Sequence, residues 1–290
     1  MTTFDLRPLS LGEILDRTFT IYRGSFLLFI GISAIPRILV LILNLAQVFV
    51  LVPMGIPMGG VGQHPPGSPE ALLKGLGALM IIGTLGFVVG LLVVLLTQGA
   101  TIVAVSEIYL GRSITIAESF RKVRGDLGTL LGLLILNVLA VIAGFIFFIF
   151  PGIYIGCRLL VSVPAALSEN IGPVEALERS FALTKDNAGR AFLILLLYVA
   201  LSMGAGLLFA APFQIGVMLS KNSPGMMTFW LAMTQVGAFI ASVLVIPVVT
   251  IASAVFYYDL RVRKEAFDLQ LLMSPQGIVP AGGGVPTVLS

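Results

Sequence analysis

The first long apolar stretch of the chain, residues 26–52, reads FLLFIGISAIPRILVLILNLAQVFVLV and contains one charged residue, Arg37. In a helix that rises ~1.5 Å per residue, about 20 such residues cross the ~30 Å hydrocarbon core of a membrane. Five further stretches of this kind follow, at about 75–106, 128–150, 152–168, 191–219 and 228–258. The sequence therefore predicts an all-α, polytopic membrane protein with about six transmembrane helices.

The amino-acid composition indicates the same class. Hydrophobic residues make up 58% of the chain and charged residues 11%, against about 25% charged residues in soluble proteins. The first apolar stretch begins only at Phe26, after a charged, helix-patterned segment, so we expect a retained span and not a cleavable signal peptide. The single cysteine, Cys157, excludes an intramolecular disulfide, and the single histidine, His64, lies in a Pro/Gly-rich loop. Because metal ligands come in convergent sets, we expect no metal and no other cofactor.

Positive charges are unevenly distributed over the segments that join the apolar stretches. Thirteen lysines and arginines lie in four of these segments, 1–25, 107–127, 169–190 and 259–290. The alternate loops hold only Lys74 and Lys221. Because cytoplasmic loops of membrane proteins carry the excess of Lys and Arg, we expect the four basic segments, and with them both termini, on the cytoplasmic side of the membrane. The Pro/Gly-rich loop at 54–70 is then external.

A seven-residue motif occurs twice, as EILDRTF at residues 13–19 and as EALERSF at residues 175–181. In the first copy, Ser10 precedes Glu13 by three residues, which is the spacing of a capping box at a helix start. In the second copy, Pro173 stands where a first helical residue is expected, since proline needs no N–H partner there. Both copies therefore predict an amphipathic helix that lies in the membrane interface.

A looser version of the motif, TIAESFRKV at residues 115–123, has the same spacing between Thr115 and Glu118. Each of the three versions precedes two spans, so each repeat consists of an interfacial helix and a transmembrane hairpin. The repeats cover about 1–110, 111–169 and 170–258. Because each repeat crosses twice, all three start on the same side, which predicts parallel repeats in a pseudo-threefold bundle. We expect a single membrane domain over 1–273 and a flexible tail over 274–290.

The charged residues of the motif allow two interpretations. Glu13 and Arg17, like Glu175 and Arg179, are four residues apart, which favours a helix-surface ion pair worth a few tenths of a kcal/mol. Alternatively, these helices dock a protein partner on the cytoplasmic face or bind anionic lipid headgroups, to which a basic residue near the membrane contributes ~1 kcal/mol.

The segments LSLGEILDRTFTIYRGSF (9–26), RLLVSVPAALSENIGPVEALERSFALTKDNAGRAF (158–192) and FYYDLRVRKEAFDLQLL (256–272) carry a family resemblance. Together they make the chain similar to the membrane domain of bacterial glycerophosphoryl diester phosphodiesterases and to its free-standing relatives. The resemblance covers nearly the whole folded chain. It implies a helical membrane module, in some relatives fused to a catalytic barrel, whose own activity is not established.

The catalytic half of such a phosphodiesterase is absent from the sequence. A barrel of that kind needs histidines as acid and base and carboxylates around a metal, whereas this chain has one histidine. It also lacks a nucleophile elbow, a catalytic triad and a phosphate-binding glycine loop. We therefore expect a protein that is not an enzyme.

Two arginines interrupt the apolar spans. Arg37 lies eleven residues into the first span and Arg158 six residues into the fourth. A central arginine costs at least ~2.5 kcal/mol on insertion scales, so both side chains should face the bundle interior, water or an anion. In one interpretation they line a cavity for a phosphate or carboxylate headgroup, with Asn137 and Gln98 as neutral hydrogen-bonding partners. In the other, Arg37 bonds carbonyls freed near Pro36, and Arg158 reaches outward to the interface.

These features favour a non-catalytic integral membrane module that binds membrane lipids, anionic ones among them, or a protein partner on the cytoplasmic face. We expect no nucleic-acid partner. The alternative is a transporter or channel for an anionic or amphipathic solute. A cavity with polar residues from several spans would favour transport, whereas a solid core with an exposed cytoplasmic patch would favour the interaction module.

Overall fold

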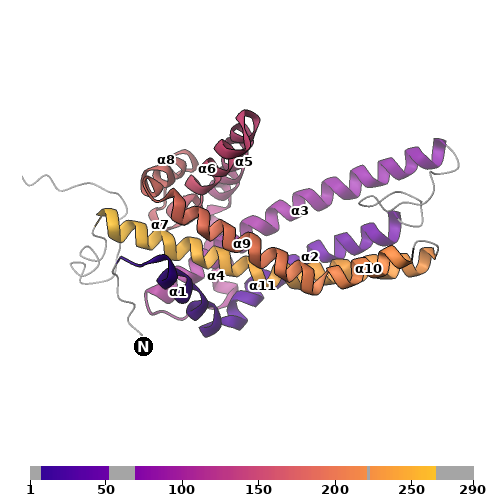
Figure 1. The fold of residues 1–290 in the computed structure, drawn as a ribbon, viewed down its shortest axis with the longest axis horizontal. Coiled ribbons are helices and arrows are strands. Elements are labelled where there is room, and N and C mark those ends of the chain that lie inside the picture. Colours follow the sequence, from indigo (N-terminus) through magenta and orange to yellow (C-terminus); the bar gives the residue numbers. More distant parts are fainter. Residues whose placement is uncertain (1–7, 52–68, 221–222, 266–290) are drawn as a thin grey trace, which may run out of the picture. The chain divides into compact units, whose positions relative to one another are not determined.

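The computed structural model describes residues 8–51, 69–220 and 223–265 (Figure 1). Within these ranges every regular element is helical, which confirms the predicted all-α class. Six helical stretches are long and apolar enough to cross a membrane: Phe26–Val50, Leu76–Tyr109, Ile116–Phe147, Ile149–Glu169, Ala188–Phe209 and Gly225–Glu265. The fold is that of a multi-pass membrane protein.

Eight helices of the described residues contain most of the apolar sequence. These are α2 (Phe26–Leu51), α3 (Pro69–Tyr109), α5 (Leu127–Phe147), α6 (Ile149–Arg158), α7 (Ser162–Glu169), α9 (Ala188–Phe209), α10 (Ala211–Leu219) and α11 (Pro224–Glu265). Four short elements accompany them: α1 (Leu11–Gly24), α4 (Ile116–Val123), the 3-10 turn η1 (Arg124–Asp126) and α8 (Pro173–Thr184). The three short α-helices coincide with the three copies of the motif.

Capping boxes begin two of the short helices, as predicted. At α1 the Ser10 N–H donates to a carboxylate oxygen of Glu13 at 2.6 Å, and the Glu13 N–H donates to the Ser10 hydroxyl at 3.3 Å. At α4 the Thr115 N–H donates to Glu118 at 2.9 Å, and the Glu118 N–H donates to the Thr115 hydroxyl at 3.3 Å. The two reciprocal bonds satisfy backbone donors that the first turn of a helix leaves unpaired.

The three short helices bury equivalent positions counted from their N-caps. The buried residues four positions after the cap are Ile14, Ser119 and Ala176, and those eight positions after it are Thr18, Val123 and Ser180. The three short helices thus share a burial pattern, and the division into three repeats stays a prediction. Because these faces are covered by protein, only the remaining faces are available for the predicted contact with the membrane interface.

The turn between the third and fourth spans differs from the prediction. Phe148, with φ −177° and ψ 164°, is the single extended residue between α5 and α6. Residues 150–152, FPG, where the third predicted span ends and the fourth begins, lie instead in the first turn of α6, where Pro151 loses no helical hydrogen bond. A Cβ on Gly144 would come within 2.8 Å of the Gly152 backbone, so the tight hairpin needs glycine at this point.

Three predicted spans have different ends or breaks. The fourth is interrupted between α6 and α7, and the fifth ends at Phe209 before the separate helix α10. The last span continues as one unbroken helix to Glu265, beyond the predicted end at 258 (Figure 1). The charged residues after position 258 therefore belong to the same helix as the apolar ones, because a helix can leave the hydrocarbon layer without ending.

Several predictions concern segments outside the described residues. These are most of the external loop at 54–70 with His64, the tail at 274–290 and the end of the predicted domain at 273.

The chain forms two compact units. The first comprises Met1–Phe26, Gln98–Leu196 and Val248–Ser290, and the second comprises Leu27–Thr97 and Leu197–Pro247. Helices α3, α9 and α11 contribute residues to both. The division into three repeats is a division of the sequence, and the single domain over 1–273 stays a prediction.

In the first unit, the C-terminal parts of the long helices α3 and α11 meet the short helix α7 through their side chains. The Tyr258 hydroxyl of α11 donates to the Ser106 hydroxyl of α3 at 2.8 Å. The buried Ser168 hydroxyl of α7 also lies beside Tyr258, without hydrogen-bond geometry. Ser106 and Ser168 each directly precede a glutamate, and Tyr258 precedes Asp259. These residues lie at the ends of the three predicted repeats, and the pseudo-threefold arrangement stays a prediction.

Candidate functional site

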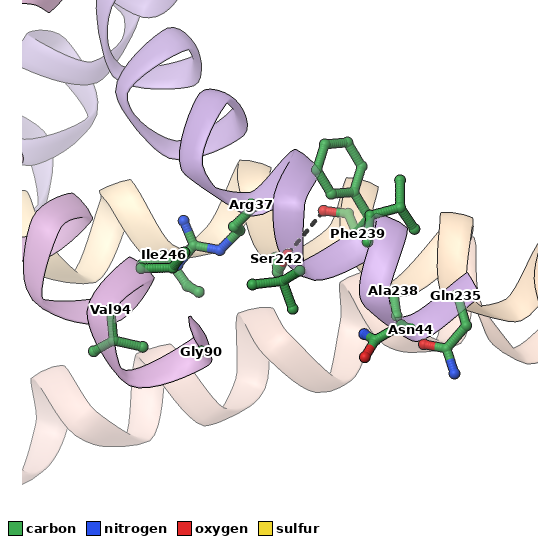
Figure 2. Close-up of a pocket in the computed structure, with 12 residues that line it drawn as sticks. Arg37, Asn44, Gly90, Val94, Gln235, Ala238, Phe239, Ser242 and Ile246 are labelled. Atoms are coloured by element: carbon green, nitrogen blue, oxygen red, sulfur yellow. Dashed lines mark hydrogen bonds between the residues drawn. The ribbon is translucent and has the colours of Figure 1, made fainter. Parts of the chain in front are cut away.

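The second unit contains a cavity of about 320 Å³ between helices α2, α3 and α11 (Figure 2). Most of its lining is apolar, from valine, leucine, isoleucine, phenylalanine, alanine and glycine residues. Its polar lining consists of Arg37 and Asn44 from α2 with Gln235 and Ser242 from α11. Ligand sites combine an apolar lining with a few polar groups in this way.

Arg37 supplies the only charged side chain of this lining. Arg37 as a whole is 8% exposed to solvent. Nη1 donates to the Ser33 carbonyl at 3.1 Å and, at the long distance of 3.5 Å, to the Thr97 hydroxyl. The Ser33 bond agrees with the alternative in which Arg37 bonds carbonyls near Pro36. That bond occupies one nitrogen, however, and in the described part of the chain Nε and Nη2 have no hydrogen-bond acceptor.

The other polar groups of the cavity are uncharged. The amides of Asn44 and Gln235 make no hydrogen bond to the described residues, whereas the Ser242 hydroxyl donates to the Phe239 carbonyl at 2.8 Å. In Figure 2, Asn44 and Gln235 lie at one end of the cavity and Arg37 lies toward Ser242 and Ile246 at the other. The cavity therefore has a charged end and an amide end.

The predicted ligand-binding residues do not all belong to this cavity. Arg37 lines it, whereas Arg158, Asn137 and Gln98 do not. These three belong to the first unit and Arg37 to the second. Asn137 on α5 donates to the Ser162 hydroxyl at 2.9 Å. Gln98 on α3 is half-buried.

Arg158 is satisfied by protein groups of the first unit. It donates to the Thr184 hydroxyl at 2.9 Å, to the Tyr154 hydroxyl at 2.7 Å and to the Phe181 carbonyl. Its guanidinium also lies over the Phe181 ring, 5.0 Å from the centroid. Arg158 therefore connects α6 to α8 and has fewer donors left for a ligand than Arg37 has.

The charged residues of the motif also interact with groups other than each other. Glu13 and Glu175 act in the caps; at α8 the Gly172 N–H donates to Glu175 at 3.3 Å, and glycine has no side chain to complete the box. The Arg17 guanidinium lies 5.5 Å from the centroid of the Tyr109 ring. Among the described residues, the predicted pair between Glu175 and Arg179 does not form, because Arg179 reaches more distant carboxylates.

Arg179 takes part in an ion-pair cluster that joins α7, α8 and α11. Its Nε lies 2.8 Å from a carboxylate oxygen of Glu169, and its Nη2 pairs with Glu265. The Tyr257 hydroxyl donates to Glu169 at 2.8 Å, and Arg261 lies 2.9 Å from Glu265. Burial alone would lower the pKa of the Arg179 guanidinium, but the two glutamates raise it above its ordinary value.

A second cluster forms around Asp259, whose carboxylate is fully buried. Asp259 accepts from the Leu9 N–H at 2.6 Å, from Arg190 at 2.8 Å and from Arg263 at 3.0 Å. Both arginines also donate to the Leu9 carbonyl. The start of α1 is thereby attached to α9 and α11, elements about 180 and 250 residues away in the sequence.

Sequence reasoning did not find the polar partners in the cavity or the Asp259 cluster. Asp259 and Arg263 are four residues apart, a spacing that indicates an ion pair on one face of a helix. Asn44 also follows Arg37 by seven residues, which places both on one helix face. No local signal relates Arg190 or Gln235 to these positions.

The geometry of the cavity suits binding of an anion. The guanidinium offers an unused donor edge, and no carboxylate lines the cavity to compete for it. Among the described residues, no group of three or more His, Cys, Asp or Glu side chains could hold a metal ion.

No protein-family model, curated protein or solved structure matches this chain.

Proposed function

We propose that the chain is a non-catalytic integral membrane module that binds a membrane lipid in the Arg37 cavity. The observation that carries this proposal is a buried guanidinium with an unused donor edge, set in a lining that is otherwise apolar or neutral. Burying an ion without a partner is costly, so an anionic ligand would offset the cost at this position.

The proposal includes the location and relationships expected from the sequence. We place both termini in the cytoplasm, on the strength of the thirteen-to-two distribution of basic residues, and the protein in a bacterial inner membrane, as the family resemblance implies. The similarity to the membrane domain of glycerophosphoryl diester phosphodiesterases makes a phospholipid the first ligand to test. The ion-pair clusters use many of the charges near the end of α11 internally, which favours lipid over a protein partner on that face.

Transport of an anionic or amphipathic solute is the second candidate. The observation in its favour is that polar side chains from two different helices, α2 and α11, face the same cavity. Transporter sites are formed in this way near the middle of the membrane. The ligand could then be the same, and the two functions differ in whether it crosses the membrane.

The test of lipid binding compares Arg37→Gln with the wild-type protein. Native mass spectrometry of protein purified in mild detergent should show retained anionic lipid in the wild type and a clear loss in the variant. Arg124→Gln is the charge-matched control, because Arg124 is exposed and lies outside the cavity. Arg158→Gln tests the other predicted arginine and should keep its lipid.

Equal retention by correctly folded Arg37→Gln protein would contradict the proposal. Size-exclusion profiles and thermal midpoints establish that the variants are folded. Reconstituted vesicles then separate the two functions: Arg37-dependent uptake of a labelled anionic amphiphile would establish transport, and retention without flux would support the binding module.

A further inference from the structure

We infer that the ligand of the Arg37 cavity carries a single negative charge at one end and a neutral hydrogen-bonding group farther along. This inference rests on the proposed function, which concerns whether an anion binds there at all. It adds the charge of the ligand and the chemistry of its second polar group.

The charge follows from the lining of the cavity. Arg37 contributes one positive charge, and the other eleven lining residues are uncharged. In a low-dielectric setting, a monoanion cancels that charge, whereas a dianion leaves one negative charge without a partner. A cation would face the guanidinium without a carboxylate to bind it, and an apolar ligand would leave the guanidinium unpaired. A phosphodiester or a carboxylate therefore fits, and a phosphomonoester in its dianionic form does not.

The orientation of the anion follows from the hydrogen bonds of Arg37. Nη1 is engaged with the Ser33 carbonyl, so the remaining donors lie on Nε and Nη2. These two nitrogens form one edge of the planar guanidinium, and an edge of this kind binds two oxygens of a carboxylate or phosphate side by side. The protein contact therefore leaves intact the donor pair that binds an oxyanion best.

The second polar group follows from the opposite end of the cavity. Asn44 is seven residues after Arg37 on α2, and Gln235 is seven residues before Ser242 on α11. Seven residues are two helical turns, or about 10 Å, so the two helices present polar groups at two matching levels. The two amides have donors and acceptors but no partner among the described residues, and a hydroxyl, ester or amide of the ligand could pair with them. Figure 2 shows Asn44 and Gln235 together at this end.

The size of the cavity limits how much of a lipid it can hold. About 320 Å³ is at the lower end of the ~300–1,000 Å³ found for ligand sites. It accommodates a headgroup or a small amphiphile, and the acyl chains of a phospholipid would extend outside. The group that binds is thus a monoanionic headgroup. It can belong to a lipid or to a free solute.

The experiment measures binding of a matched set of ligands to delipidated full-length protein by native mass spectrometry. Phosphatidylglycerol and phosphatidylmethanol are both monoanionic phosphodiesters, and only the first has free hydroxyls. Phosphatidic acid, at about pH 8 and so above the ~6 of a phosphomonoester second pKa, supplies the dianion. Phosphatidylcholine is the zwitterionic control, and soluble glycerophosphoglycerol tests the free headgroup.

We expect phosphatidylglycerol to bind about tenfold more tightly than phosphatidic acid, as a difference of ~1.4 kcal/mol gives. Asn44→Ala and Gln235→Ala should each weaken binding of phosphatidylglycerol more than that of phosphatidylmethanol and so remove the preference between the two. Gln98→Ala, an amide outside the cavity, should leave the preference as it is. Binding of glycerophosphoglycerol as tight as that of the lipid would identify a solute as the source, and much weaker binding would identify the lipid.

Two outcomes keep the inference and the proposed function distinguishable. If Arg37→Gln abolishes binding but phosphatidic acid binds the wild type as tightly as phosphatidylglycerol, the single-charge inference is overturned and anion binding stands. If Arg37→Gln binds every ligand as the wild type does, the proposed function itself fails.

Discussion

The Asp259 carboxylate is a fully buried charge that holds three donors from three parts of the chain. Arg190 and Arg263, its two cationic partners, have side chains that are 21% and 34% exposed. A buried ion pair contributes little net free energy to folding, because desolvation of the charges offsets their attraction. Loss of one charge nevertheless destabilises the protein, because the opposite charge stays buried without a partner. Removal of the Asp259 charge would therefore cost more stability, by leaving two arginines without a counter-ion, than any one of its bonds contributes.

Asp259→Asn should destabilise the protein by about 3 kcal/mol, the lower end of the range for removing one partner of a buried pair. The amide keeps the shape and can still accept from the Leu9 N–H, but the positive charges lose their counter-ion. Thermal unfolding in detergent measures the effect. Asp186→Asn is the matched control, because Asp186 is exposed and its positive φ of 68° suits asparagine equally well. Equal loss of stability in both variants would contradict this account.

Packing between α9 and α11 depends on one glycine. A Cβ at Gly237 of α11 would collide with the carbonyl oxygen of Phe209, the last residue of α9. Both residues belong to the second unit. A backbone atom cannot rotate away as a side chain can, so this close approach requires glycine. The break between α9 and α10 is thus located beside Gly237 of α11.

Gly237→Ala should destabilise the second unit by about 1–3 kcal/mol, the usual cost of overpacking. Gly206→Ala, on α9, is the control, since a Cβ there meets nothing within 4 Å. Fluorescence of Trp230, the only tryptophan and itself packed against Gly216, reports on unfolding of this region. A wild-type unfolding midpoint for Gly237→Ala would show that the two helices can separate without cost.

At the scale of the whole chain, each of the segments around α1, α4 and α8 is attached to the C-terminal part of a membrane-span helix. Lys122 of α4 lies 2.6 Å from Glu107 of α3, and Arg179 of α8 lies 2.8 Å from Glu169 of α7. In these two cases the helix that supplies the glutamate directly precedes α4 or α8 in the sequence. The bond from Leu9 to Asp259 attaches the start of α1 to α11 and so closes the series. Three parallel repeats related about one axis would produce this cyclic pattern.

The proposed topology predicts which positions an impermeant thiol reagent reaches in intact cells. In a Cys157→Ser background, cysteines at Arg124 and Lys185 should be protected, and a cysteine at Ser223 should be labelled. All three native residues are exposed and so are accessible from their own side of the membrane. Labelling after cell disruption shows that the protected sites are reactive. The reverse labelling pattern would overturn the assignment of the basic segments to the cytoplasm.

Local features of the sequence were sufficient to predict the spans and the starts of the short helices. Hydropathy along 26–52 predicted a span that the structure has over Phe26–Val50, because crossing a hydrocarbon layer depends on length and apolarity alone. The caps at Ser10 and Thr115 were predictable because both partners lie within one helical turn. The end of α11 was not, because hydropathy changes where a helix leaves the membrane even if the helix continues.

The sequence by itself also determined that Arg37 needs a partner, since an arginine among apolar residues is costly wherever the helix packs. Only the tertiary structure decided which residues surround it. Asn137 and Gln98 were predicted as neighbours, whereas Asn44, Gln235 and Ser242 line the cavity. Which faces of α2 and α11 meet depends on helix rotation and on close contacts such as that at Gly237. The same reason applies to Asp259, whose partners Leu9 and Arg190 are far away in the sequence and are brought to it by packing.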